Sequence, residues 1–381
     1  MSSGRRSSVP KVPFLLVLIG GICQLGSAQG GASQQSWTTR SQLTDPNGTA
    51  NPTRSTTTHS EVDGRSVEKT VVEARGPDGR YLPYSEIERE SVRVNQTTVR
   101  NVERSYGRTP DGQRVLTQET REESRRFPDG ENKVSRTTLN PDGNGALQIV
   151  QRELVDSKQV SPGVRETKTT LFSADGSGGL GPSMQIDERE RKTDSGAVEF
   201  TKSTSLADGT GHWTLNEVRE GSTRKDASGA ITKEERVSRP DAEGKMAVAE
   251  RTVTRQSEAG PGQQNQTTET YSTNVPGRAG SEGLQLVRRE STVQRTAGSG
   301  AHNTTRRVEQ TNPGDPGAGL QVTQEAIDIV RPGANGTAAQ TSVVRSSDSN
   351  GQLNTVWVDV GHTDNPAAVK VDTGPAKKPN Q

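Results

Sequence analysis

The sequence has one cysteine, few aromatic residues and no long hydrophobic run. The cysteine, Cys23, lies near the N-terminus, so the rest of the chain has no disulfide, no thiolate nucleophile and no Cys-bound metal. The 381 residues include only four Phe, four Tyr and three Trp, and 27% are hydrophobic, against about 45 to 50% in typical domains. Several thick globular cores cannot be built from this composition. The chain is therefore either disordered or organised by pairing of polar groups.

An excess of one charge sign is also lacking, since 48 Lys and Arg face 47 Asp and Glu. Nucleic-acid binding proteins usually carry a basic stripe with interleaved aromatics. Here acidic and basic residues mix closely, as in 86–90 and 187–191. Nucleic acid is therefore excluded as a partner, and an envelope polymer or another protein stays open. Balanced charge also counts against disorder, which usually accompanies a high net charge.

Motifs for catalysis or metal binding are absent from the sequence. The four histidines lie far apart, without zinc-ligand spacing: His59, His212, His302 and His362. No Gly-x-Ser-x-Gly elbow is present. Three Gly-rich turns, which begin at Asp142, Asp175 and Asp208, offer one carboxylate each, whereas Ca²⁺ takes about six to eight oxygen ligands. We predict hairpin turns there, no catalytic, cofactor-binding or metal-binding residues, no cofactor, and no enzymatic activity.

The N-terminus has the layout of a secretory signal. Arg5, Arg6 and Lys11 precede a short apolar stretch, 12–22, and small residues follow up to Ala28. A spanning helix needs about 20 apolar residues, so we predict cleavage after Ala28 and no transmembrane anchor. A lipidated Cys23 and twin-arginine export fit the neighbouring residues less well. Export without disulfides favours a bacterial envelope, with the periplasm, the cell surface and the medium all open.

Gly-bearing turn signals recur about every 33 residues, which predicts a repeat. A first series lies at Gly79, Gly112, Gly143, Gly176, Gly209 and Gly244. A second series alternates with it at Gly64, Gly130, Gly163, Gly196, Gly229 and Gly262. Asp-Gly pairs favour the positive φ angles of hairpin turns. The sequence therefore predicts about eight units of two legs each.

The legs between turns predict β-strands. Segments such as 146–155 and 164–172 are about ten residues long, rich in Thr and Val, and partly alternate apolar with polar residues. Helices of this length without packing partners would be marginal, since they need about 12 to 15 residues. Consecutive hairpins give an elongated antiparallel meander. About 17 strands at roughly 4.8 Å spacing would extend about 80 Å if flat, and an open ribbon or a curled sheet are both compatible.

Apolar residues gather near the first-series turns, whereas charged residues occupy the strand middles. The apolar positions include Leu147, Ile149, Phe172, Leu206, Trp213, Leu215, Leu284, Leu286, Leu320 and Val322. Adjacent strand ends would align them in a stripe along one edge of the sheet, while the middles form charge ladders. An outer-membrane barrel is disfavoured, because it needs a lipid-facing apolar band and aromatic girdles.

The sequence thus divides into a signal peptide (1–28), a flexible linker (29–60), an all-β hairpin-repeat domain (61–361) and a disordered tail (362–381). We expect an exported, non-enzymatic scaffold with a structural or binding role in the cell envelope or the extracellular space. One alternative is a largely disordered, polymer-like secreted protein. Another is a secreted carbohydrate-active enzyme, which would require one unit to break the pattern with an acidic or His cluster.

Overall fold

The computed structural model describes residues 33–44, 50–76, 78–175, 178–277, 283–333, 338–348 and 350–363. The predicted signal peptide and nearly all of the predicted tail lie outside these residues. All regular structure in the described ranges is β-strand. No helix found there has the length and apolar character needed to cross a membrane.

The described chain forms 20 strands in a single sheet. In order they are β1 (Ser33–Thr44), β2 (Ala50–Val62), β3 (Arg65–Arg75), β4 (Tyr81–Arg93), β5 (Thr98–Arg108), β6 (Arg114–Arg126), β7 (Asn132–Pro141), β8 (Leu147–Ser161), β9 (Val164–Ala174), β10 (Leu180–Lys192), β11 (Val198–Ala207), β12 (Trp213–Lys225), β13 (Ile231–Pro240), β14 (Met246–Gly260), β15 (Gln263–Ser272), β16 (Gln285–Thr296), β17 (His302–Thr311), β18 (Leu320–Pro332), β19 (Ala338–Ser347) and β20 (Leu353–Thr363).

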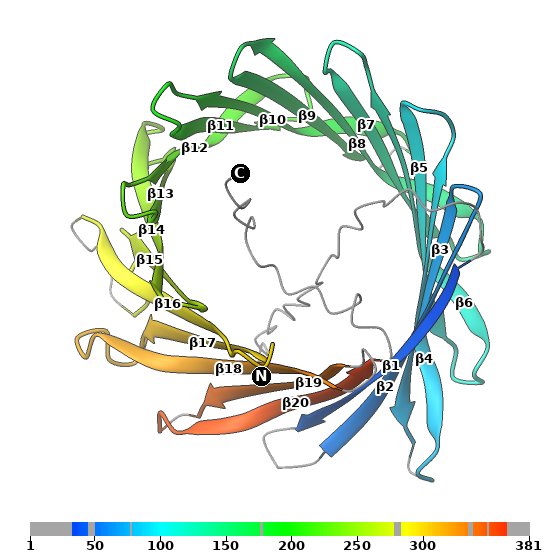
Figure 1. Ribbon diagram of the computed structural model, residues 1–381. Coiled ribbons are helices and arrows are strands. Elements are labelled where there is room, and N and C mark those ends of the chain that lie inside the picture. Colours follow the sequence, from blue (N-terminus) through cyan, green and yellow to red (C-terminus); the bar gives the residue numbers. More distant parts are fainter. Residues whose placement is uncertain are drawn as a thin grey trace, which may run out of the picture.

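Each strand pairs antiparallel with the next along the chain, so the predicted all-β meander is confirmed. The last strand also pairs with the first, through residues 357–362 of β20 and 38–43 of β1. This pairing closes the sheet into a ring (Figure 1) and decides between an open ribbon and a curled sheet. Twenty strands at about 4.8 Å spacing and about 40° tilt give a backbone radius of roughly 20 Å.

The segment predicted as a flexible linker, 29–60, contains β1 and most of β2. Its Thr- and Ser-rich composition suggests a linker, but Thr is also favourable in strands. Residues 53–62 form a ladder with 65–74 of β3. The ordered sheet therefore begins earlier than the sequence indicated, and β1 supplies the edge on which the ring closes.

Most first-series hairpins share a short turn with a left-handed glycine. In the β7–β8 turn, Gly145 donates to the carbonyl of Asp142, and Asp142 donates to that of Ala146. Gly145 has φ of 82°, a conformation that only glycine adopts without strain. Equivalent glycines with positive φ follow at the constant interval of the sequence repeat: Gly112, Gly178, Gly211 and Gly244. Sequence inspection selected Gly143 instead of Gly145, because its Asp-Gly pair resembles a two-residue turn.

A β-bulge recurs at the same place in successive even-numbered strands. The extra residues have no partner in one ladder and follow one another at the same constant interval: Thr117, Val150, Ser183, Asn216 and Ala249. Two of them bond a carbonyl of the facing strand: Thr117 Oγ1 donates to Ser105 O at 2.9 Å and Ser183 Oγ to Leu171 O at 3.3 Å. Bulges bend a strand and increase its twist. One bulge per hairpin therefore curls the sheet evenly until its ends meet.

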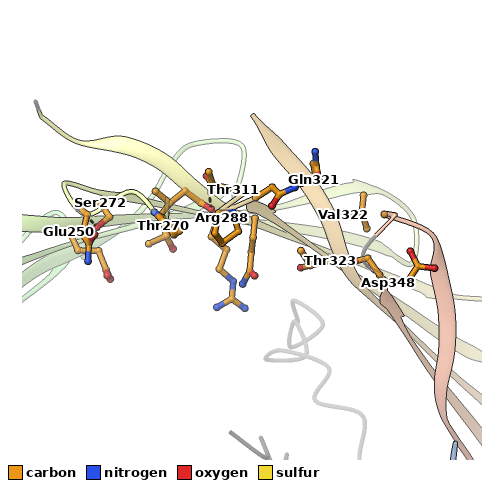
Figure 2. Close-up of a pocket in the computed structure, with 17 residues that line it drawn as sticks. Glu250, Thr270, Ser272, Arg288, Thr311, Gln321, Val322, Thr323 and Asp348 are labelled. Atoms are coloured by element: carbon orange, nitrogen blue, oxygen red, sulfur yellow. Dashed lines mark hydrogen bonds between the residues drawn. The ribbon is translucent and has the colours of Figure 1, made fainter. Parts of the chain in front are cut away.

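Cross-strand pairing divides the side chains between two faces, because residues opposite each other point to the same side. The N–H groups of Arg93 and Lys192 donate to Gly64 and Gly163, which precede the neighbouring strands β3 and β9. Followed around the sheet through the cross-strand pairs, both side chains point to the same face as Arg288, which lies on the concave side (Figure 2). We call this side the lumen face and the other the outer face. Figure 2 shows Arg288, a lumen-face residue, on the concave side of the sheet.

Apolar side chains gather at one rim of the ring, which we call the first rim because the first-series turns lie there. On the outer face they form a belt that consists mainly of Tyr81, Tyr106, Leu116, Leu139, Leu147, Ile149, Phe172, Trp213, Leu215, Met246, Val248, Tyr271, Leu286, Leu320, Val322 and Leu353. The belt contains most members of the predicted stripe, whereas Leu206 points to the lumen. On the even strands it is mostly two outer positions tall, about 7 Å along the strand.

Candidate functional site

Side chains singled out in the sequence do not converge in the structure. His59 lies in β2, His212 in a first-rim turn and His302 at the start of β17. The side chain of His362 lies outside the described residues. No group of three or more metal-binding side chains is found in the described ranges. In the Asp142 turn, Oδ1 accepts the N–H groups of Asn144 and Ala146 at 2.8 and 2.9 Å, as a hairpin turn requires.

Ion-pair ladders run along the outer face at the strand middles. Glu119 on β6, 5% exposed, accepts Arg104 Nε at 2.7 Å and Arg121 Nη2 at 2.6 Å. Glu86 on β4, 4% exposed, pairs with Lys69 at 2.8 Å and with Arg114 at 2.5 Å. Burial alone would raise the pKa of Glu119, but hydrogen bonds from the two arginines outweigh it and lower that pKa below its ordinary 4.5. These carboxylates are therefore charged at neutral pH.

The lumen face carries similar ladders. Arg136 bridges Glu122 and Glu153 at 2.6 and 2.7 Å, and thereby joins β6, β7 and β8. On the other half of the ring, Arg219 links Glu217 and Glu235 at 2.6 and 3.1 Å. Both faces of the sheet are thus charged at mid-height, and polar pairing takes the place of a core, as the composition indicated.

Substitution Glu119→Gln should destabilise the ring by about 1 to 2 kcal/mol, because two charged hydrogen bonds are lost while both arginines can still reach water. Urea unfolding followed by circular dichroism would measure the change. Glu220→Gln, at an exposed outer-face glutamate of β12, is the matched control and should stay within about 0.5 kcal/mol. Equal effects of the two substitutions would show that the ladder contributes nothing.

The regular first-rim turns give way to two longer loops between β15 and β18. Residues 273–284 connect β15 to β16, and residues 312–319 connect β17 to β18. The loops touch, because a side chain at Gly277 would collide with the carbonyl of Pro313. Val275 in the first loop is 4% exposed, unusually buried for this chain. The hairpin pattern is therefore interrupted at one place on the rim.

A groove of about 610 Å³ lies beside these loops, within the roughly 300 to 1,000 Å³ typical of ligand sites. Figure 2 shows residues that line it. By their cross-strand pairs, its lumen-face side chains come from β14, β15, β16, β17 and β18: Glu250, Thr270, Ser272, Arg288, Gln310 and Gln321. Thr311 and Thr323 also line it, together with Asn274 and Asn312 from the loops. Hydroxyl and amide groups dominate, and no aromatic side chain is among the lining residues.

Arg288 is the one basic residue that lines the groove. Its Nη2 donates to Glu290 Oε2 at 3.0 Å, whereas its Nε is buried without an acceptor. Glu290 is shared, since Arg306 donates to it from Nε at 2.5 Å and from Nη2 at 2.9 Å. Hydrogen bonds from Arg306 lower the pKa of Glu290 despite its burial. Two guanidinium groups thus share one carboxylate, while two further carboxylates, Glu250 and Asp348, line the groove.

Sequence reasoning named no site residues and missed this groove. The available signal was spacing: Gly277 still follows Gly244 at the regular interval, but the next first-rim glycines with positive φ, Gly283 and Gly319, depart from it. The two loops that interrupt the hairpin pattern carry no cluster of acidic or His residues in the sequence. Nothing in the local residues marks Arg288, because arginines recur throughout the strands.

No protein-family model and no curated protein sequence match the chain. Among solved structures, the siderophore receptor PirA from Pseudomonas aeruginosa is similar with a TM-score of 0.51 at 9% identity, over 89% of this chain and 81% of that one. A mutant porin of Rh. blastica has a TM-score of 0.32 at 11% identity, over 87% and 99% of the two chains. The outer membrane protein OmpT of Vibrio cholerae gives 0.27 at 8%, over 88% and 99%. At these identities the likeness concerns the fold alone.

Proposed function

We propose that this chain is an exported, non-enzymatic scaffold: a hollow β-ring that stands in water in the cell envelope or outside the cell. The signal-like N-terminus supports export. The ring offers a large surface on both faces, and the described residues hold no catalytic constellation. The observation that carries the proposal is the charged outer face at mid-height.

The outer face differs from what a lipid bilayer requires. Barrels that span a membrane present an apolar band about 25 Å tall, and a charged Arg or Lys at the bilayer midplane costs about 2 to 4 kcal/mol. Here the apolar belt is about 7 Å tall. Above it lie ion pairs such as Arg104–Glu119, Arg251–Glu234 and Arg289–Glu269. Many such charges would have to enter the hydrocarbon together.

The second candidate is an outer-membrane barrel, which the closed 20-strand sheet and the fold likeness to PirA favour. The two candidates predict opposite behaviour in lipid. They share export and the ring, so they differ only in what surrounds the outer face.

The full chain, expressed with its own leader in a Gram-negative host, should be released with the periplasm or the medium and stay in the supernatant after carbonate extraction of membranes. Purified without detergent, it should elute as one species with a β-rich circular dichroism spectrum. A resident porin and a periplasmic enzyme serve as fractionation markers. Recovery of the chain with the porin, in the carbonate-resistant pellet, would favour the membrane barrel and refute the proposal.

A further inference from the structure

The groove beside the 273–284 and 312–319 loops differs chemically from the rest of the lumen wall. Several other lumen-face arginines are held between glutamates of neighbouring strands, as Arg136 is between Glu122 and Glu153 and Arg89 between Glu68 and Glu103. In the groove, Arg288 has Thr270 and Gln310 as its lateral partners. Its charge therefore faces hydroxyl and amide groups rather than two acids.

Arg288 retains capacity to bind an anion. Its buried Nε has no acceptor, and its ion-pair partner Glu290 is already engaged by Arg306. A buried donor without a partner costs about 1 to 3 kcal/mol. The Arg288 side chain as a whole is 42% exposed, so a shift of the guanidinium would let an incoming carboxylate bond Nε. This would remove the penalty and form a charge-assisted hydrogen bond, for which the planar guanidinium is well suited.

The rest of the lining selects for hydroxyl groups. Thr270, Gln310 and Gln321 each offer donors and acceptors on the lumen face within the groove. No aromatic side chain lines the groove to stack on a flat ring. The ligand must therefore be recognised by its carboxylate and its hydroxyls, and not by an apolar surface.

We propose that the groove binds a hydroxyl-rich carboxylate, specifically a uronic acid unit of an acidic polysaccharide. Its carboxylate would bond Arg288, and its hydroxyls would bond the side chains of Thr270, Gln310 and Gln321. Glu250 lies two strands from Arg288, at roughly 10 Å. Glu250 and Asp348 both line the groove, so their carboxylates repel the anion and keep its binding weak. This site adds a ligand to the scaffold and does not depend on whether the ring stands in water or in lipid.

The probe is trigalacturonate, titrated by calorimetry into the full exported chain, with maltotriose as a neutral trisaccharide for comparison. We expect weak binding of trigalacturonate and at least tenfold weaker binding of maltotriose, since a charged hydrogen bond contributes about 1.5 to 3 kcal/mol. Arg288→Gln should reduce trigalacturonate affinity about tenfold or more. Glu250→Gln should increase it, because an acid near the site is neutralised.

Arg219→Gln is the matched control, because Arg219 lies on the lumen face in β12, away from the groove, and is held by Glu217 and Glu235. It should leave trigalacturonate binding unchanged while the circular dichroism of all variants matches that of the parent chain. The proposal is overturned if trigalacturonate does not bind at millimolar concentration, if maltotriose binds as well, or if Arg288→Gln and Arg219→Gln have the same effect. These binding outcomes do not depend on whether cell fractionation finds the chain in the soluble fraction or in the membrane.

Discussion

A chain that ends after Ser347, without β20, is expected to lose its monomeric form and to associate into soluble oligomers or aggregates. β20 pairs with β19 through residues 338–347 and with β1 through residues 38–43. Its removal leaves two long edges with unpaired N–H and C=O groups, which are templates for strand addition. Size-exclusion chromatography with light scattering would show most of the protein above the monomer mass.

The control for this truncation deletes strands from within the sheet and keeps the β1–β20 pairing. Deletion of Leu180 to His212 takes out one hairpin and joins the β9 turn to β12. Trp213 then takes the place of Leu180, because Ala174–Leu180 and Ala207–Trp213 are equivalent pairs. This chain should close as an 18-strand ring and stay monomeric. If both shortened chains stay monomeric, the β1–β20 pairing does not hold the molecule together.

Acidification is expected to unfold the ring, with most of the β-sheet signal lost by pH 3. Hydrogen bonds from Arg54, Arg251 and Arg306 lower the pKa values of Glu73, Glu234 and Glu290 below the ordinary 4.5. The sign follows from linkage: these carboxylates stabilise the folded state above their ordinary pKa, and this contribution is lost as the pH falls through their lowered folded values. Stability should thus be level between about pH 6 and 8 and fall below about pH 4.5.

Urea midpoints at pH 7, 5 and 3, followed by circular dichroism, would measure this dependence. The effect should be large because few hydrophobic residues are buried and the ladders are repeated around the ring. At pH 7, high salt should lower the midpoint by less than acid does, since salt screens exposed pairs but does not remove their charges. An unchanged urea midpoint at pH 3 would mean that the ladders contribute little.

Much of this fold is readable from the sequence because each hairpin encodes it locally. Asp and Gly mark the turns, Thr and Val mark the strands, and pairs such as Trp213 and Leu215 mark the apolar rim. Ring closure could not be read in this way. Closure depends on curvature that accumulates over the whole sheet from bulges at residues such as Thr117 and Ser183. A bulge shifts the register of the ladder but has no clear residue signature.

The N-terminal strands were missed for a related reason. Segment 53–58 is rich in Thr and Ser, and such residues suit a linker as well as a strand. Only the facing ladders of β3 and β20 decide between the two. The groove was missed because its side chains, among them Thr270, Arg288 and Gln310, are ordinary strand residues. Their importance comes from the two neighbouring loops, which sequence spacing shows only as an irregular step.

Because equivalent bulges recur at one constant interval, the diameter of the ring depends on the number of hairpin repeats that the gene encodes. Each added hairpin contributes two strands, which widen the backbone ring by about 4 Å without altering any existing turn, bulge or ladder. In-frame duplication or loss of one unit would therefore produce a series of tubes of graded bore with the same wall chemistry. Tandem recombination would tune the width of the ring, while point mutation would tune the chemistry of its wall.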